Sequence, residues 1–137
     1  MSGHTGDGPA TLDAQSLEAA LTVADLGVSM AWYRDVLGFV VDREFAREGR
    51  LRAVRMRAGA VRILLGQDDG SKGAARSKGE GFSLQLTTGQ DVDEMARRIR
   101  LRGGTLESEP VTMAGARAFR LRDPDGFRLT ISAPRWD

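Results

Sequence analysis

The chain carries one pattern twice, and this internal duplication limits its possible folds more than any other feature. Residues 25–38 have the pattern of a capped helix that ends at a glycine, and residues 91–104 have the same pattern over the same interval. The shift that carries one helix onto the other also lays "AVRILLG", residues 60–66, onto "GFRLTIS", residues 126–132. Two agreements at one shift indicate a duplicated module, and two copies are too few for a solenoid.

Each copy predicts a strand, a helix and three more strands. The alternation in "LEAALTV" predicts a half-buried strand that turns Leu17, Ala19, Leu21 and Val23 inward. Asp25 and Asp91 are expected to cap the two helices. The first helix should bury Val28, Met30, Ala31, Trp32 and Val36, and the second Met95, Ala96 and Ile99. The remaining strands are expected at 39–45, 50–57, 60–66, 82–88, 105–110, 116–123 and 127–132. A ferredoxin-like alternative has one strand too few per copy.

The length and the charge balance narrow the function. A chain of 137 residues with 41% hydrophobic and 28% charged residues is typical of one globular domain. A net charge of +1 argues against nucleic acid or an anionic membrane as a partner. The absence of cysteine excludes thiolate chemistry. No apolar run predicts a membrane span or a signal peptide, so we expect a cytoplasmic location.

The domain organisation follows from the polar stretches between the modules. Residues 1–15 are expected to form a flexible tail, which holds the chain's one histidine, His4. Residues 16–134 form the single domain, with module 1 at 16–66, a linker loop at 67–80 and module 2 at 81–134. The glycine-rich linker loop has the wrong spacing for a phosphate-binding loop. It remains open whether it is a plain linker or a mobile lid over a ligand.

Two motifs resemble those of a known family. The run "DLGVSMAWYRDVLGF" at 25–39 and the turn "DPDGF" at 123–127, together with the duplication, resemble the vicinal oxygen chelate superfamily. That superfamily includes glyoxalase I, extradiol dioxygenases and bleomycin-resistance proteins. The resemblance spans residues 17–134 and implies an α+β fold of tandem βαβββ modules that form a glyoxalase-like half-barrel cleft.

The resemblance also implies where a metal would be bound. In metal-dependent members the ligands point into the cleft from the first and last strands of each module. Strand alternation places Glu18, Leu64, Ser83 and Thr130 at those four positions. One carboxylate beside a leucine, a serine and a threonine does not supply the donors of a transition-metal site. We therefore expect no metal and no cofactor.

The cleft-facing positions supply the candidate ligand-binding residues. Glu18 is a general base, a carboxylate that fixes a cationic ligand group, or an ordinary carboxylate that lies in water or is paired with Arg62 or Arg128. Arg62 and Arg128, which the duplication relates, either form an anion clamp or are solvated or paired across a sheet. The full set of candidate ligand-binding residues is Glu18, Arg62, Leu64, Ser83, Gln85, Arg128 and Thr130.

The sequence favours a metal-independent protein that sequesters or carries a small organic ligand in the cleft, as a homodimer of the bleomycin-resistance type. The alternative is a lyase or dioxygenase-like enzyme that uses an unconventional metal site or Glu18 as acid and base. A third possibility is an interaction protein whose cleft is filled by its own side chains. Neither the ligand nor the arrangement of the dimer can be derived from the sequence.

Overall fold

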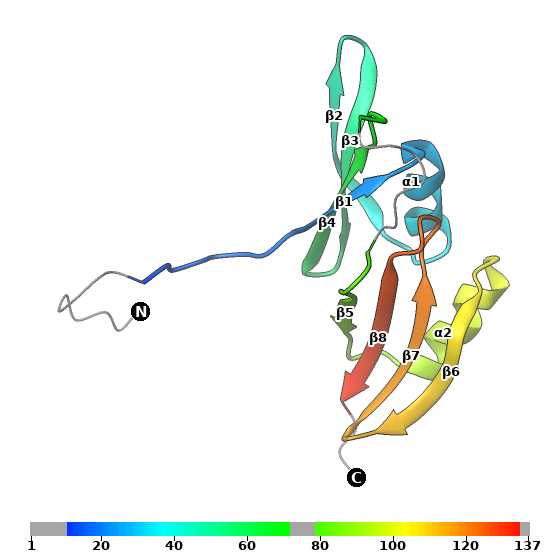
Figure 1. Ribbon diagram of the computed structural model, residues 1–137. Helices are drawn as coiled ribbons and strands as arrows, with labels where there is room; N and C mark the ends of the chain where they lie inside the picture. The colour runs from blue at the N-terminus through cyan, green and yellow to red at the C-terminus, as the bar shows by residue number, and fades with distance from the viewer. Residues whose placement is uncertain (1–10, 72–78, 135–137) are drawn as a thin grey trace.

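The computed structural model describes residues 11–71 and 79–134 and contains two four-stranded sheets, each with one helix (Figure 1). His4 and residues 72–78 of the linker loop lie outside the described residues. The elements are β1 (Ala19–Val23), α1 (Leu26–Asp35), β2 (Val40–Arg47), β3 (Arg50–Ala58), β4 (Val61–Gln67), β5 (Leu84–Thr87), α2 (Val92–Leu101), β6 (Leu106–Met113), β7 (Ala116–Arg122) and β8 (Arg128–Pro134).

The two modules have the same topology, which confirms the predicted tandem βαβββ fold. The strand order is β1-β4-β3-β2 in the first sheet and β5-β8-β7-β6 in the second. In each sheet the first and last strands of the module are parallel, and the remaining pairs are antiparallel. Helix α1 packs against β2, β3 and β4, and α2 packs against β6, β7 and β8 (Figure 1). Each sheet therefore has one face covered by its own helix and one open face.

Both helices begin where the sequence predicts, because aspartates cap them. Asp25 accepts a hydrogen bond from the backbone N–H of Val28, and Asp91 accepts one from Glu94. The buried face of α2 contains Ala96 and Ile99, as expected.

The predicted buried face of α1 was wrong in part. The buried residues are Leu26, Ser29 and Tyr33, whereas Val28 is 53% exposed. These three residues follow the three-to-four spacing of one helix face. The hydropathy pattern concealed this face because two of its members, a serine and a tyrosine, carry hydroxyl groups.

The first strand of each module is shorter than predicted. Pairing of β1 with β4 starts at Ala19, and pairing of β5 with β8 starts at Leu84. Residues before these points have no neighbouring strand to cover them, so Leu17 is 95% exposed and Phe82 is 46% exposed. The prediction that both point into the core was wrong, although the Phe82 ring still makes an edge contact with the Phe127 ring.

A turn of module 2 is hydrogen bonded to the helix of module 1. Tyr33 is fully buried in α1, and its hydroxyl donates to Oδ2 of Asp123 at 2.9 Å. Two residues later Asp125 accepts from the backbone N–H of Ala24 at 2.8 Å and from the hydroxyl of Ser29 at 3.4 Å. We call this set of five residues the α1 joint. It explains why the "WYRDVLGF" and "DPDGF" motifs occur together in one chain.

Candidate functional sites

The candidate ligand-binding residues of β4 and β8 lie on the open faces of the two sheets, opposite the helices. In β8 the side chains of Leu129 and Ile131 are buried, and Arg128 and Thr130 alternate with them. In β4 the buried residues are Ile63 and Leu65, so that Arg62 and Leu64 take the other face. Glu18 and Ser83 immediately precede the strands β1 and β5.

On the open face of the first sheet, Glu18 forms an ion pair with Arg55. The Nε atom of Arg55 lies 2.6 Å from Oε2 of Glu18, and Nη2 lies 3.4 Å from Oε1. Both side chains are about a quarter exposed. The hydrogen bond from Arg55 to Glu18 raises the pKa of the guanidinium. The expected partners Arg62 and Arg128 were therefore wrong.

Register explains this choice of partner. Leu64 in β4 pairs with Ala20 on one side and with Arg55 of β3 on the other. Glu18 precedes Ala20 by two residues and so extends over the same open face. Arg55 lies in β3, which is separated from β1 by β4. Its long side chain reaches across β4 to the carboxylate of Glu18.

Two further residues complete a cluster that sequence reasoning missed. The guanidinium of Arg43 lies 5.0 Å from the centroid of the Phe45 ring, and that of Arg55 lies 5.4 Å from it. Both distances are typical of cation–π contacts. Alternation within β2 and β3, combined with the strand order, would have placed these residues on one face. The cluster of Glu18, Arg43, Phe45, Arg55 and Leu64 is called the module 1 cluster below.

On the open face of the second sheet, three of the candidate residues are hydrogen bonded to one another. The side-chain amide of Gln85 donates to Oγ of Ser83 at 2.8 Å and to Oγ1 of Thr130 at 3.3 Å. Thr130 pairs across the sheet with Gln85 and with Arg120. This group is polar and neutral, and its hydroxyl and amide groups suit the orientation of a ligand by hydrogen bonds.

Arginines dominate the rest of this face. Arg122 binds Glu107 at 2.5 Å, and Arg128 pairs with Arg122 across the sheet. The pKa of Glu107 is lowered by the hydrogen bond from Arg122 and further by the charges of Arg128 and Arg120. One carboxylate thus stands among three guanidinium groups.

The candidates from the two modules are not joined by polar contacts. In residues 11–71 and 79–134, no hydrogen bond or ion pair joins Glu18, Arg62 or Leu64 to the candidates on the second sheet. Arg62 and Arg128 occupy corresponding positions of β4 and β8, and neither forms an ion pair with a described residue. Each sheet therefore presents its own half of a candidate site.

The four positions that the family resemblance implies for a metal do not fit one here. Leu64 offers no donor atom, Glu18 is engaged by Arg55, and Ser83 and Thr130 share the amide of Gln85. The described ranges contain no group of three or more His, Cys, Asp or Glu that could hold a metal ion. Within the same ranges, no helix is both long enough and apolar enough to cross a membrane.

A pocket of about 590 Å³ lies apart from the candidate ligand-binding residues. It is bordered by the turn between β3 and β4, the segment from β5 to α2, and helix α2 itself. None of the seven candidate ligand-binding residues lines it. Periodicity and composition did not predict this pocket.

The paired βαβββ modules and their open sheet faces define a protein of the glyoxalase type. Residues 15–131 match the Glyoxalase/Bleomycin resistance protein/Dioxygenase superfamily, and the chain belongs to this superfamily. The match confirms the family resemblance inferred from the two motifs.

Solved structures with the same fold cover nearly the whole chain. A member of this superfamily from Sphaerobacter thermophilus DSM 20745 is 27% identical with a TM-score of 0.68, over 88% of this chain and 98% of that one. TnmS3, an antibiotic-binding protein from Streptomyces sp. CB03234, is 18% identical with a TM-score of 0.73, over 91% and 99%. TioX from Micromonospora sp. ML1 is 18% identical with a TM-score of 0.69, over 88% and 99%. No curated protein sequence matches the chain.

Proposed function

We propose that this protein binds a small organic ligand on its open sheet faces without the help of a metal. The observation that carries the proposal is the module 1 cluster. There the Phe45 ring lies beside two guanidinium groups, and Glu18 holds one of them in place. A half-buried aromatic ring among fixed charges is suited to stack a flat ligand and to orient its polar groups.

The second sheet would supply the hydrogen-bonding half of the site. Its Ser83, Gln85 and Thr130 offer hydroxyl and amide groups, and Arg128 adds a positive charge. The antibiotic-binding relative TnmS3 supports a ligand of this general kind.

A homodimer accounts for the separation of the two halves. A second copy would place further open faces opposite those of the first, so that a ligand could be enclosed between subunits. Residues 11–18 run away from both sheets, with Leu12 and Leu17 almost fully exposed (Figure 1). This segment offers additional apolar surface to a second copy.

The enzymatic alternative requires Glu18 to exchange protons with a substrate. Both of its carboxylate oxygens lie within 3.4 Å of Arg55, so a substrate must compete with an ion pair already formed. This geometry favours a role in orientation over one in acid–base catalysis.

Thermal melts against a panel of aromatic antibiotics, run with and without chelator and paired with elemental analysis by mass spectrometry, test the proposal. At least one compound should raise the melting temperature equally in both conditions, since only binding to the native state stabilises it. Phe45→Ala and Glu18→Gln should weaken that shift. Asp35→Asn, which removes another arginine partner on α1, should leave it unchanged. Stoichiometric metal whose removal abolishes binding, or no shift from any compound, would contradict the proposal.

A further inference from the structure

The pocket beside α2 combines an apolar wall with two positive charges. Its volume of about 590 Å³ lies within the range of small-molecule sites, roughly 300–1,000 Å³. It opens between parts of both modules, because the β3–β4 turn comes from module 1 and α2 from module 2. Its apolar side chains include Phe39, Leu86, Met95 and Ile131, and its cationic ones are Arg98 and Arg102.

The duplication shows what fills the corresponding place in the other half of the molecule. The shift that carries Asp25 onto Asp91 also carries Gly59 onto Asp125 and Ser29 onto Met95. In the α1 joint, Asp125 accepts hydrogen bonds from Ala24 and Ser29 at the start of α1. In the β3–β4 turn beside the pocket, Gly59 takes the position that corresponds to Asp125. The turn therefore supplies no side chain and no negative charge to this place.

The hydrogen bond between Tyr33 and Asp123 in the α1 joint also has no equivalent at the pocket. The same shift relates Tyr33 to Ile99 and Arg57 to Asp123. Ile99 is fully buried and has no polar group to offer, and Arg57 forms an ion pair with Asp42 at 3.6 Å. The β3–β4 turn is thus not hydrogen bonded to α2 as the β7–β8 turn is to α1, and the space between them stays open.

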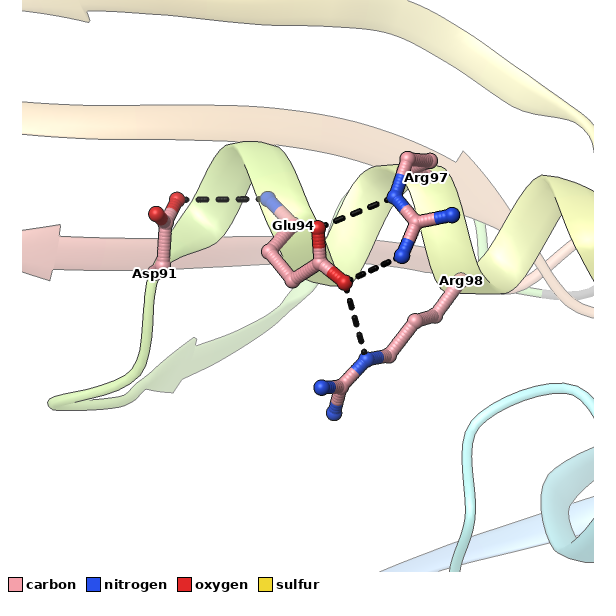
Figure 2. Close-up of polar contacts among 4 residues, drawn as sticks. All are labelled: Asp91, Glu94, Arg97 and Arg98. Carbon is pink, nitrogen blue, oxygen red and sulfur yellow. Dashed lines mark hydrogen bonds and ion pairs between the residues drawn. The ribbon is translucent and has the colours of Figure 1, made fainter.

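The two arginines that line the pocket have hydrogen-bond donors that suit an anion. Figure 2 shows Glu94 of α2 shared between Arg97 and Arg98, and the bond to Arg98 uses only Nε, at 3.3 Å. The side chain of Arg102 forms no hydrogen bond or ion pair with any described residue. The terminal nitrogens of Arg98 and the whole guanidinium of Arg102 are therefore available to a ligand.

We propose that this pocket is a second ligand site, which binds a small organic carboxylate with an apolar body. The carboxylate of the ligand is held by Arg98 and Arg102, in the space that the β3–β4 turn leaves open beside α2. The apolar body lies against Phe39, Leu86 and Met95. This site contains none of the seven candidate ligand-binding residues and does not depend on the function proposed for the open faces.

Titration calorimetry with decanoate, and with decanol as an uncharged probe of equal chain length, tests this site. Decanoate should bind at one per chain and at least about tenfold more tightly than decanol, because only the carboxylate is recognised by the arginines. Arg98→Gln and Arg102→Gln should each weaken decanoate binding about three- to tenfold. Arg100→Gln changes the same helix at a residue that does not line the pocket and is bonded to Glu109, not to Glu94, and it should have no effect.

A matched pair at the turn tests the comparison with the α1 joint. Gly59 has a φ of 57° and no atom within 4 Å of an added Cβ, so both variants meet the same backbone strain. Gly59→Asp should weaken decanoate binding more than Gly59→Asn, because only the aspartate competes for the arginines. Decanol that binds as tightly as decanoate, an Arg98→Gln/Arg102→Gln double variant that binds normally, or loss of binding in Glu18→Gln would each overturn the proposal. Failure here would leave the antibiotic-binding test of the open faces unaffected.

Discussion

Removal of the Tyr33 hydroxyl tests whether the α1 joint stabilises the whole domain. Tyr33 is fully buried and Asp123 is 5% exposed, so water does not readily replace the 2.9 Å hydrogen bond between them. Tyr33→Phe deletes a single oxygen and leaves the ring against Trp32 and Phe39, whose centroids lie 4.9 and 5.4 Å away. The change in stability therefore reports on the hydrogen bond and not on packing.

The expected loss follows from the acceptor. A hydrogen bond to a charged group contributes about 1.5–3 kcal/mol, and a buried acceptor that loses its donor retains its desolvation cost. Oδ1 of Asp123 keeps its bonds from the backbone N–H groups of Asp125 and Phe127, both at 2.9 Å. We therefore expect a loss of about 2 kcal/mol. With an unfolding entropy of about 2.1 cal/mol/K per residue, this lowers the melting temperature of the domain by about 7 °C.

Calorimetric melts of the wild type, Tyr33→Phe, Asp123→Asn and the double variant would measure this contribution. The double variant should lose less stability than the two single variants together, because both remove the same bond. A shift below about 2 °C for Tyr33→Phe, or full additivity of the two changes, would refute the reasoning.

The same residue predicts a dependence on alkaline pH. Burial, and then the charge of Asp123, raises the pKa of Tyr33 well above its ordinary value. The folded protein thus keeps a proton that an unfolded tyrosine loses near pH 10, so stability is fully present below that pH and falls as the pH rises. The stability gap between the wild type and Tyr33→Phe should shrink by about 1.4 kcal/mol by pH 11. A gap that does not change between pH 8 and 11 would contradict this account.

Two further tests concern the packing between modules and the first turn of α2. Gly104→Ala would place a Cβ 2.7 Å from Cγ1 of Val36 in module 1 and 2.5 Å from Cγ2 of Ile99, and chemical denaturation should show a loss of about 1–3 kcal/mol. Gly89→Ala, with no atom within 4 Å, should change stability by less than about 1 kcal/mol. The hydrogen bond from Arg97 lowers the pKa of Glu94 to about 2. Acid melts should show that Glu94→Gln loses stability relative to wild type above about pH 4.5 and that this difference fades toward pH 2; an NMR titration midpoint above 4 would contradict it.

The sequence predicted the features that depend on neighbouring residues. Asp25 and Asp91 cap the helices because an aspartate side chain reaches the backbone N–H three residues ahead, a contact that needs no distant partner. Alternation in β8 placed Thr130 on the open face for the same local reason. The strand ends were less predictable. Leu17 has the alternation of a core residue, but nothing in its own segment shows that β4 fails to extend beside it.

The partner of Glu18 depends on strand order, which composition and periodicity do not contain. Arg55 is 37 residues away from Glu18 in the chain. It can reach Glu18 because a single strand, β4, lies between β1 and β3. Arg62 is nearer in the sheet yet forms no ion pair with a described residue. A carboxylate beside an edge strand can thus be paired with an arginine two strands away. The arginine nearest to it in the sheet is therefore not always its partner.

The difference between the β3–β4 turn and the β7–β8 turn lies in the sequence, but only the structure shows its consequence. Residues 57–60 read "RAGA" where residues 123–126 read "DPDG". The β3–β4 turn therefore has neither of the two carboxylates of the β7–β8 turn. Only the fold shows that each turn faces the helix of the other module. In the β7–β8 turn, two carboxylates are hydrogen bonded to module 1. The β3–β4 turn has no such carboxylates, and a pocket lined by arginines lies beside it. The two places should therefore respond in opposite ways. Tyr33→Phe should lower stability and leave decanoate binding intact, whereas Arg102→Gln should weaken binding and leave stability nearly unchanged.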